Sequence, residues 1–275
     1  MQPLGIQRGT TALVFDDRPI PKRIGLVVLA TDHTTEPDFR RLVASDTIAV
    51  YTARIAHANP TTPDNLRRMR PHLKKSAGLI LPDEPLDAIC YSCTSASVVI
   101  GDDVVEAAIR AAKPGVPVVT PPLAVVRALK ALGARRISIL TPYTVETSAP
   151  FAGYFADHGF EVASFRCFGL EDDRVVARVS LVSLVAGAIE ATAPDADALF
   201  ISCTALRAAG VAPEIERAIG RPVVTSNLAT AWTCLRLCGA DEGRPALGRL
   251  MALPARNNGR GLAQSAAGAG VPFES

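Results

Sequence analysis

The sequence predicts an α/β protein of two similar lobes, each with a mainly parallel sheet flanked by helices, related by a pseudo-twofold axis. Three observations predict this fold. Short apolar strands alternate with amphipathic helices, as in parallel sheets covered on both faces. The order of strands and helices occurs twice. One phrase also occurs twice, as "DAICYSCT" at 87–94 and "DALFISCT" at 197–204, which indicates an internal duplication.

The first copy begins with the apolar stretch "RIGLVVLAT", which we expect to form a buried strand. Further strands follow, separated by amphipathic helical patterns. Pro114 and Gly115 should stop the second helix, because proline cannot continue a helix. The predicted strands are 23–31, 86–94 and 116–121, and the predicted helices are 63–80, 102–115 and 122–135.

The second copy repeats this order, starting with the strand "RRISILTPYT". Gly159 and Gly220 should close two of its helices, since glycine is common just after a helix end. Its last unit, "RPVVTSNLATAWTCL", repeats the strand-then-helix pattern that ends the first copy. The predicted strands are 135–144 and 197–204, the predicted helices are 151–159, 177–192 and 210–220, and the last unit is 221–235.

The repeat divides the chain into an N-terminal lobe at 20–125 and a C-terminal lobe at 126–250. We expect the helix after residue 226 to complete the first lobe. The stretch 251–275 is rich in glycine, alanine and serine, so it is predicted to be a flexible tail.

Composition and charge narrow the function classes. The 275 residues are 48% hydrophobic and 20% charged, with a formal net charge of +2. Interleaved charges of both signs argue against nucleic acid or a membrane as partner, and the apolar runs are too short to span a bilayer. The N-terminus has charges where a secretion signal needs an apolar core, so a cytoplasmic protein is expected. A homo-oligomer is compatible with these features.

The six cysteines are expected to be reduced thiols, since no secretion signal is recognised. Cys93 and Cys203 end the two copies of the repeated phrase and are the candidate catalytic residues. The histidines are not at zinc spacings and no nucleotide-binding loop is present, so we expect neither a metal nor an organic cofactor. The other cysteines are expected to fill space in the core, and they are Cys90, Cys167, Cys234 and Cys238.

The two thiols are predicted to face one ligand across a cleft between the lobes. Ligands of parallel α/β sheets bind at the carboxyl ends of strands, where both thiols should lie, each before a helix start. A helix N-terminus lowers the pKa of a thiol, and its free amides bind carboxylates. The residues expected to form this carboxylate site are Thr94, Ser95, Thr204 and Ala205.

The chain resembles the aspartate/glutamate racemase superfamily, and within it the branch of maleate cis–trans isomerases and arylmalonate decarboxylases. The resemblance covers roughly residues 22–250 and includes a likeness to the ectoine-utilization relative in the loop "ATDHTTE". The stretches that show it are "IGLVVLATDHTTEPDF", "CTSASVVIG", "RRISILTPYTVE", "FISCTAL" and "RPVVTSNLATAW".

The resemblance implies roles for individual residues. Cys93 falls where maleate isomerases keep a nucleophile and decarboxylases have glycine, and Cys203 falls on a thiol that both groups share. Thr94 and Ser95 match residues that hold a carboxylate, and Tyr143 matches a tyrosine that donates to it.

Two positions depart from the family pattern. Asp32 and, with a looser match, Asp173 stand where maleate isomerases have asparagine. An ionised aspartate repels a carboxylate, whereas asparagine can donate to it. A substrate with an ammonium or amidinium group, as in amino acids and ectoine, would therefore suit Asp32. The alternative is that Asp32 only caps the following helix.

Three functions stay open from the sequence. The first is a cofactor-independent isomerase or racemase of a small carboxylic or amino-acid-like substrate, in which Cys93 and Cys203 are the catalytic pair. Such an enzyme could act in ectoine or hydroxyectoine degradation. The second is an arylmalonate-type decarboxylase in which Cys203 donates a proton. The third is a non-catalytic binding protein, since two lobes also describe such proteins. The paired thiols favour the first.

Overall fold

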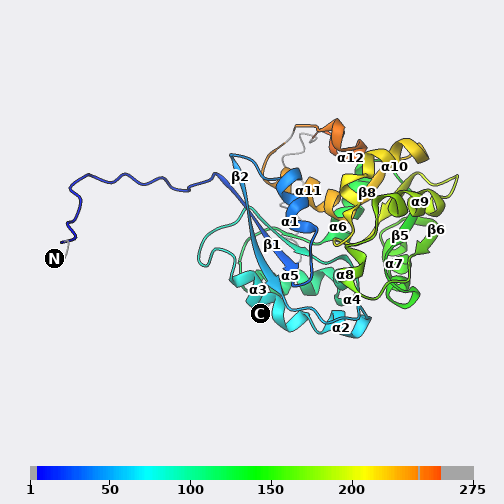
Figure 1. Cartoon of the computed structure of the whole chain (residues 1–275), viewed down its shortest axis with the longest axis horizontal. Coiled ribbons are helices and arrows are strands. Elements are labelled where there is room, and N and C mark those ends of the chain that lie inside the picture. The colour runs from blue at the N-terminus through cyan, green and yellow to red at the C-terminus, as the bar shows by residue number, and fades with distance from the viewer. Residues whose placement is uncertain (1–4, 241, 255–275) are drawn as a thin grey trace, which may run out of the picture.

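Two four-stranded parallel sheets form the two lobes of the computed structural model, which describes residues 5–240 and 242–254. The strand order is β2-β1-β3-β4 in the first sheet and β6-β5-β7-β8 in the second, so the two lobes repeat one topology. Every strand pairing is parallel. The predicted fold class is therefore confirmed (Figure 1).

The strands that the sequence predicts include the two central strands of each sheet, β1 and β3 in the first and β5 and β7 in the second, and one edge strand of each, β4 and β8. The first sheet consists of β1 (Lys22–Leu29), β2 (Ile48–Ile55), β3 (Ala88–Ser92) and β4 (Val118–Val119). The second consists of β5 (Arg136–Thr141), β6 (Glu161–Cys167), β7 (Ala198–Ile201) and β8 (Val223–Thr225). The edge strands β2 and β6 were not predicted. Strand β2 mixes buried and accessible residues and β6 has no fully buried residue, so neither shows the continuous apolar run that marks a central strand.

Helices cover both sheets. In the first half they are α1 (Thr35–Leu42), α2 (Pro63–Arg67), α3 (Leu73–Gly78), α4 (Thr94–Ile100), α5 (Asp102–Arg110) and α6 (Pro121–Ala131). In the second half they are α7 (Val145–Asp157), α8 (Asp173–Val176), α9 (Leu181–Ala191), α10 (Ala212–Ile219), α11 (Ser226–Leu237) and α12 (Arg249–Ala252). Short 3₁₀ turns occur at Arg70–His72, Arg207–Gly210 and Pro245–Leu247.

Several predicted helices differ from the observed ones in their bounds, including α7, which begins at Val145 and not at 151. The helix expected over 63–80 is divided into α2, a 3₁₀ turn and α3, because Pro71 lies within the turn and interrupts the helical hydrogen bonds. Helix α5 ends at Arg110, before Pro114. In the turn that follows, Lys113 is buried and its ammonium donates to the carbonyl of Leu81.

Two helices lie between the two sheets. Helix α6 contacts β3 of the first sheet and β8 of the second, and α11 also contacts β8. Helix α11, the one expected to complete the first lobe, contacts β3 and β4 of the first sheet, and α6 and α11 pack on each other. One continuous apolar core runs through this junction and includes residues of both lobes.

The C-terminal boundary differs from the expectation. The predicted tail begins at 251, yet Met251 is buried and belongs to α12, so packing continues beyond residue 250. Residues 255–275 of the predicted tail lie outside the described residues. At the other end, residues 5–16 have no regular structure and extend away from the lobes (Figure 1).

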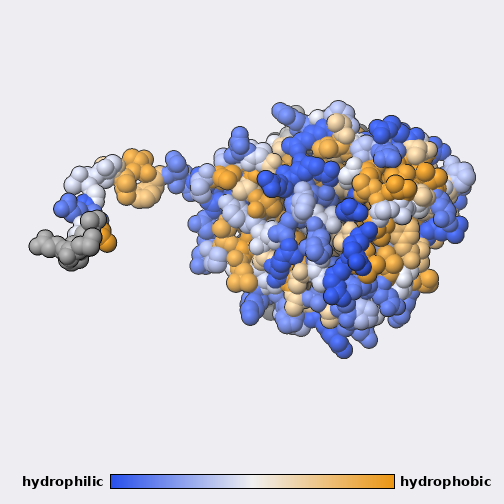
Figure 2. All heavy atoms as spheres, in the orientation of Figure 1, coloured by the Kyte–Doolittle hydropathy of each residue, from blue (hydrophilic) through white to orange (hydrophobic). Residues whose placement is uncertain are grey.

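No helix in the described chain is long and apolar enough to cross a bilayer. Apolar surface gathers over the second lobe (Figure 2), where Leu181, Val182 and Ile189 of α9 are exposed. A homo-oligomer stays a prediction, and α9 is a natural place to look for its interface.

Candidate active site between the lobes

Cys93 lies at the junction of β3 and α4. It is the residue before the first helical turn, with an extended backbone (φ −148°, ψ 106°), and its carbonyl accepts hydrogen bonds from the amide and the hydroxyl of Ser97. The amide of Ala96 points at the thiol, and the hydroxyl of Ser95 lies 3.8 Å from Sγ. The predicted setting of this cysteine, at a strand end and a helix start, is therefore present in the structure.

Cys203 lies at the equivalent end of β7, but no α-helix begins after it. The chain bends through Thr204 and Leu206 and then forms a 3₁₀ turn, so the expected helix start is wrong for the second thiol. Cys203 has φ +89°, a left-handed conformation that is rare for a residue with a side chain. The amide of Ala205 donates to its Sγ at 3.4 Å.

Tyr143 lies beside both thiols at the end of β5. Burial, followed by the nearby Cys203 and Cys93, raises its pKa well above the usual value. Its hydroxyl lies 3.4 Å from that of Ser202, and a hydrogen bond from Tyr143 favours the thiolate of Cys203. The tyrosine is thus a neutral donor that joins the site to the second thiol.

Two buried carboxylates border the thiols, one from each lobe. The hydroxyl of Thr31 donates to Asp173 Oδ2 at 2.7 Å, and the amide of Asp173 donates to Asn59 Oδ1 at 3.3 Å. These contacts tie the β1–α1 loop and the loop after β2 to the start of α8. The charge of Asp173 acts on both thiols, whereas that of Asp32 acts on Cys93.

Asp32 also caps the start of α1, from two residues before the N-cap residue Thr34, whose own side chain makes no capping hydrogen bond. Its Oδ1 accepts from the amides of Thr34 and Thr35, at 2.7 and 2.8 Å, and its Oδ2 accepts from the Thr35 hydroxyl at 2.6 Å. Burial raises the pKa of both Asp32 and Asp173. Capping and proximity to Cys93 coexist, because the loop that caps the helix also borders the site.

The expected lowering of the thiol pKa values is wrong. Burial raises the pKa of Cys93 to about 12, and Asp173 and Asp32 add to the rise, while the Ala96 amide and the Ser95 hydroxyl oppose it. Burial and the charge of Asp173 raise the pKa of Cys203 well above the usual value. The two residues are 3% and 5% exposed. Desolvation therefore outweighs the amides, and both thiols are neutral at ordinary pH.

The predicted threonine hydroxyls take part in contacts between the lobes. Thr94 Oγ1 donates to Ser226 Oγ of α11 at 2.8 Å, and Thr204 Oγ1 donates to the carbonyl of Ser92 at 3.0 Å. These hydrogen bonds place the two thiol loops against each other. For binding a carboxylate they leave the Ser95 hydroxyl and the first-turn amides of α4, which have no acceptor within the helix.

The structure brings the predicted site residues together, each of them buried. They are Asp32, Cys93, Thr94, Ser95, Tyr143, Asp173, Cys203, Thr204 and Ala205. Sequence reasoning missed Thr31, Asn59 and Ser202. The position of Ser202 directly before the thiol was a usable signal. Asn59 had none, because it lies after the unpredicted strand β2.

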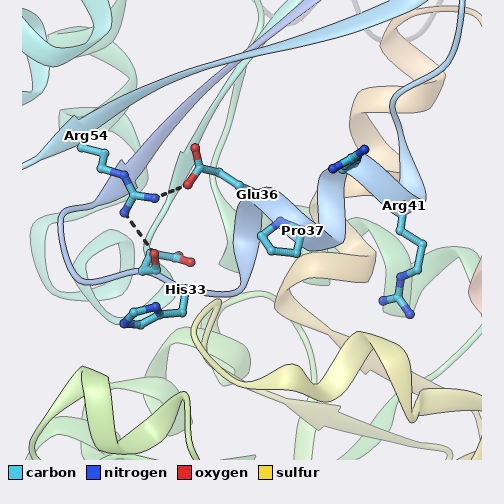
Figure 3. A pocket seen from close by; sticks show the side chains of 7 residues that line it. His33, Glu36, Pro37, Arg41 and Arg54 are labelled. Carbon is cyan, nitrogen blue, oxygen red and sulfur yellow. Dashed lines mark hydrogen bonds and ion pairs between the residues drawn. The ribbon is translucent and has the colours of Figure 1, made fainter.

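Two cavities flank the site from outside. One of about 710 Å³ is lined by Asp32, His33, Glu36 and the arginines 40, 41 and 54, and one of about 520 Å³ lies between His33 and the segment 172–178. In Figure 3 Arg54 points toward Glu36, while Arg41 lies on the far side of the first cavity. Neither thiol lines either cavity, whereas the carboxylate residue Asp32 lines the first.

The site holds the groups that proton transfer or thiol addition needs. It places two thiols, a phenol and two carboxylates in one water-poor space. The described residues include no group of three or more histidine, cysteine, aspartate or glutamate side chains that could hold a metal ion. Cys90 and Cys93 belong to different core clusters.

Comparison with known proteins points to one family. The family model of arylmalonate decarboxylase matches residues 74–251. Arylmalonate decarboxylase of Bordetella bronchiseptica is 37% identical over 140 residues, which are 50% of this chain and 58% of that protein. Maleate isomerase of Pseudomonas putida is 25% identical over 246 residues, covering 83% of this chain and 96% of that protein.

A solved structure shows the same fold. It is a maleate cis-trans isomerase mutant from Nocardia farcinica with a covalently bound succinylcysteine intermediate. It is 24% identical, has a TM-score of 0.76, and covers 84% of this chain and 98% of its own. The relatives are enzymes of two classes, isomerases and a decarboxylase.

Proposed function

The chain belongs to the arylmalonate decarboxylase family, and on this premise we propose that it is a cofactor-independent two-cysteine isomerase or racemase of a small carboxylic or amino-acid-like substrate. The observation that supports this most is the burial of Cys93 and Cys203 in one site with Tyr143 beside them. Decarboxylation needs a proton on one face of a carbanion. A second thiol is useful only in a reaction that acts on two carbons of the substrate or on both faces of one carbon.

An unsaturated substrate would be isomerised through a covalent thioether adduct. The thiolate of Cys93 adds to one alkene carbon and forms a C–S bond, while Cys203 gives its proton to the neighbouring carbon. Rotation about the resulting single bond follows. The thiolate of Cys203 then removes a proton from the carbon it protonated, and the C–S bond breaks to release the isomer and the Cys93 thiolate. The succinylcysteine of the Nocardia relative is an adduct of this kind.

For an amino-acid-like substrate the same pair would racemise. One thiolate removes the α-proton, and the other thiol delivers a proton to the opposite face. The Ser95 hydroxyl, the α4 amides and Tyr143 would stabilise the enediolate that forms between these steps. Either route needs one thiol to ionise, whereas burial keeps both thiols neutral. The substrate must therefore help a thiol to ionise.

The two carboxylates define the substrate class. Asp32 and Asp173 disfavour a dianion and hold the thiol pKa values high. A substrate cation between them would cancel both effects and let a thiol ionise. We therefore infer a zwitterion with a carboxylate at one end and an ammonium or amidinium at the other, such as an amino acid, ectoine or hydroxyectoine. Reduced thiols of this kind fit a cytoplasmic location.

A decarboxylase is the second candidate. The observation that favours it is the neutral thiol of Cys203 beside Tyr143, already protonated as a proton donor must be. In that case Cys93 would be dispensable, so a Cys93→Gly variant would keep or gain decarboxylation of an arylmalonate.

Proton NMR in D₂O tests the proposal. The protein is incubated with maleate, phenylmalonate, a set of amino acids, ectoine and hydroxyectoine. Deuterium entering an α-position supports racemisation, loss of the maleate olefin signal with growth of fumarate supports isomerisation, and loss of a carboxyl group supports the decarboxylase. A Cys93→Ala/Cys203→Ala variant is the control. No change with any of the zwitterions would contradict the substrate class.

A further inference from the structure

We propose that Asn227 is a positioning residue that holds Cys203 in its left-handed backbone conformation. The inference rests on the proposed function, in which Cys203 transfers a proton. Asn227 lies in the first turn of α11, is buried, and contacts the carbonyl directly after the thiol. It does not touch the thiol itself, so its effect passes through the backbone.

The conformation of Cys203 requires support from its surroundings. A side chain in the left-handed region is strained, and such strain persists only when contacts around it fix the backbone. The following residues, "TALRAAG" at 204–210, include alanine, leucine and arginine, which favour a helix. In an α-helix the carbonyl of Thr204 would accept from the amide of Ala208. Some other donor must occupy that carbonyl for the bend to form.

Asn227 and Thr34 are the donors to this loop. Asn227 Nδ2 donates to the Thr204 carbonyl at 2.9 Å, and Thr34 Oγ1 donates to the Ala205 carbonyl at 2.7 Å. Both carbonyls after the thiol therefore bind side chains from elsewhere in the fold. The bend also places the Ala205 amide on the sulfur of Cys203.

Asp38 orients the amide of Asn227. Asn227 Nδ2 also donates to Asp38 Oδ2 at 2.8 Å, and Arg41 donates to Asp38 Oδ1 at 2.9 Å. Both contacts of Nδ2 are acceptors, so the nitrogen must face the Thr204 carbonyl and the amide cannot turn over. An aspartate at 227 would lose this donation, because a carboxylate only accepts.

The same contacts join the second thiol to the β1–α1 loop. Asp38 and Arg41 belong to α1, and the amide of Thr34 donates to Asp32, the proposed substrate-binding carboxylate. A movement of this loop on substrate binding would reach the backbone of Cys203 through Thr34 and Asn227. Asn227 therefore couples the position of the proton-transferring thiol to the substrate-binding loop.

Asn227→Leu is the direct test, since leucine has a similar volume and no donor. The rate of alkylation of each thiol by iodoacetamide is followed by mass spectrometry across pH 7–10, with kcat and KM on the substrate found above. We expect the Cys203 rate to rise at least about tenfold while that of Cys93 changes less than about twofold. We expect kcat to fall roughly 10²-fold with little change in KM.

A swapped pair separates positioning from simple packing. Asp38→Asn with Asn227→Asp keeps the hydrogen bond between α1 and α11 but leaves the Thr204 carbonyl without its donor. The swap should therefore behave like Asn227→Leu. Thr233→Val removes a buried hydrogen bond elsewhere on α11 and should leave both alkylation rates unchanged.

The outcomes are distinct. A swap with wild-type Cys203 alkylation and kcat overturns the proposal, and so does an Asn227→Leu variant that folds and changes neither. If Asn227→Leu does not fold, the swap and Thr34→Val take its place with the same expectations. The alkylation rates require no substrate, so failure of the proposed function would leave this inference separately tested.

Discussion

The two thiol loops begin with the same three residues and end in different structures. Ser-Cys-Thr occurs at 92–94 and 202–204, each time at the end of a central parallel strand. In the first loop the seven residues from Thr94 onward form α4. In the second loop the seven residues from Thr204 to Gly210 bend and form only a 3₁₀ turn. The more helix-favouring of the two segments is the one that does not form an α-helix.

Competition for carbonyls explains the difference. In the first loop the carbonyl of Cys93 accepts from the Ser97 amide and hydroxyl, so the first helical turn closes on itself. In the second loop Asn227 and Thr34 donate to the carbonyls of Thr204 and Ala205, which a helix would need for its own amides. The duplication thus gave both thiols the same local sequence, and tertiary contacts gave the two loops different backbone conformations.

The largest expected effect is the loss of turnover when either thiol is removed. Cys93→Ala removes the covalent route and should abolish isomerisation. Cys203→Ala removes a proton-transfer group and should lower kcat by about 10²–10⁴-fold. In a racemase, each variant should instead stop racemisation, and α-proton exchange should survive from one enantiomer only. Turnover by NMR measures this, with the core variant Cys90→Ala as control. Wild-type rates in both thiol variants would contradict the site assignment.

The stability of the protein at high pH should report the burial of Cys93. Its pKa is raised from 9.0 to about 12, so the folded state retains the proton that the unfolded chain releases. The neutral thiol therefore contributes stability that is fully present below pH 9 and is lost as pH rises toward 12. Urea unfolding at several pH values should show a smaller loss over this window for Cys93→Ala. Identical slopes would show that the thiol is hydrated in solution.

The two carboxylates should distinguish the thiols from each other. Asp173 raises the pKa of both, whereas Asp32 raises that of Cys93. Asp173→Asn should therefore speed iodoacetamide alkylation of both thiols, and Asp32→Asn that of Cys93 alone. Asparagine at 32 can still cap α1. Each variant should also improve binding of a dianion such as maleate by on the order of 1–3 kcal/mol. Unchanged maleate binding would place the carboxylates away from the substrate.

Glycine substitutions at the two cysteine positions test whether the two backbone conformations differ in strain. Cys203→Gly removes the strain of a positive φ, while Cys93→Gly changes an unstrained extended residue. Both lose a buried thiol, so that cost cancels in the difference. Cys203→Gly should be the more stable variant by about 1–2 kcal/mol in urea unfolding. Equal stabilities would mean that the left-handed conformation of Cys203 is not strained.

Much of the site could be predicted because its residues end strands. The periodic apolar runs located β1, β3, β5 and β7, and the polar residues that follow a parallel strand gather at one edge of its sheet. Cys93 and Cys203 follow from that rule. Asp32, Tyr143 and Asp173 follow from family resemblance, and Asp173 lies at the start of a short helix that no pattern marked.

The sequence by itself determined the two lobes, their parallel sheets and the pairing of Cys93 with Cys203, because local periodicity and a repeated phrase encode them. Only the tertiary structure decided that the thiols are neutral, that Asp32 caps a helix while bordering the site, and that Cys203 is left-handed. The physical reason is that desolvation and carbonyl partners depend on residues distant in the chain. Thr34 and Ala205, 171 positions apart, share one hydrogen bond that no local pattern contains.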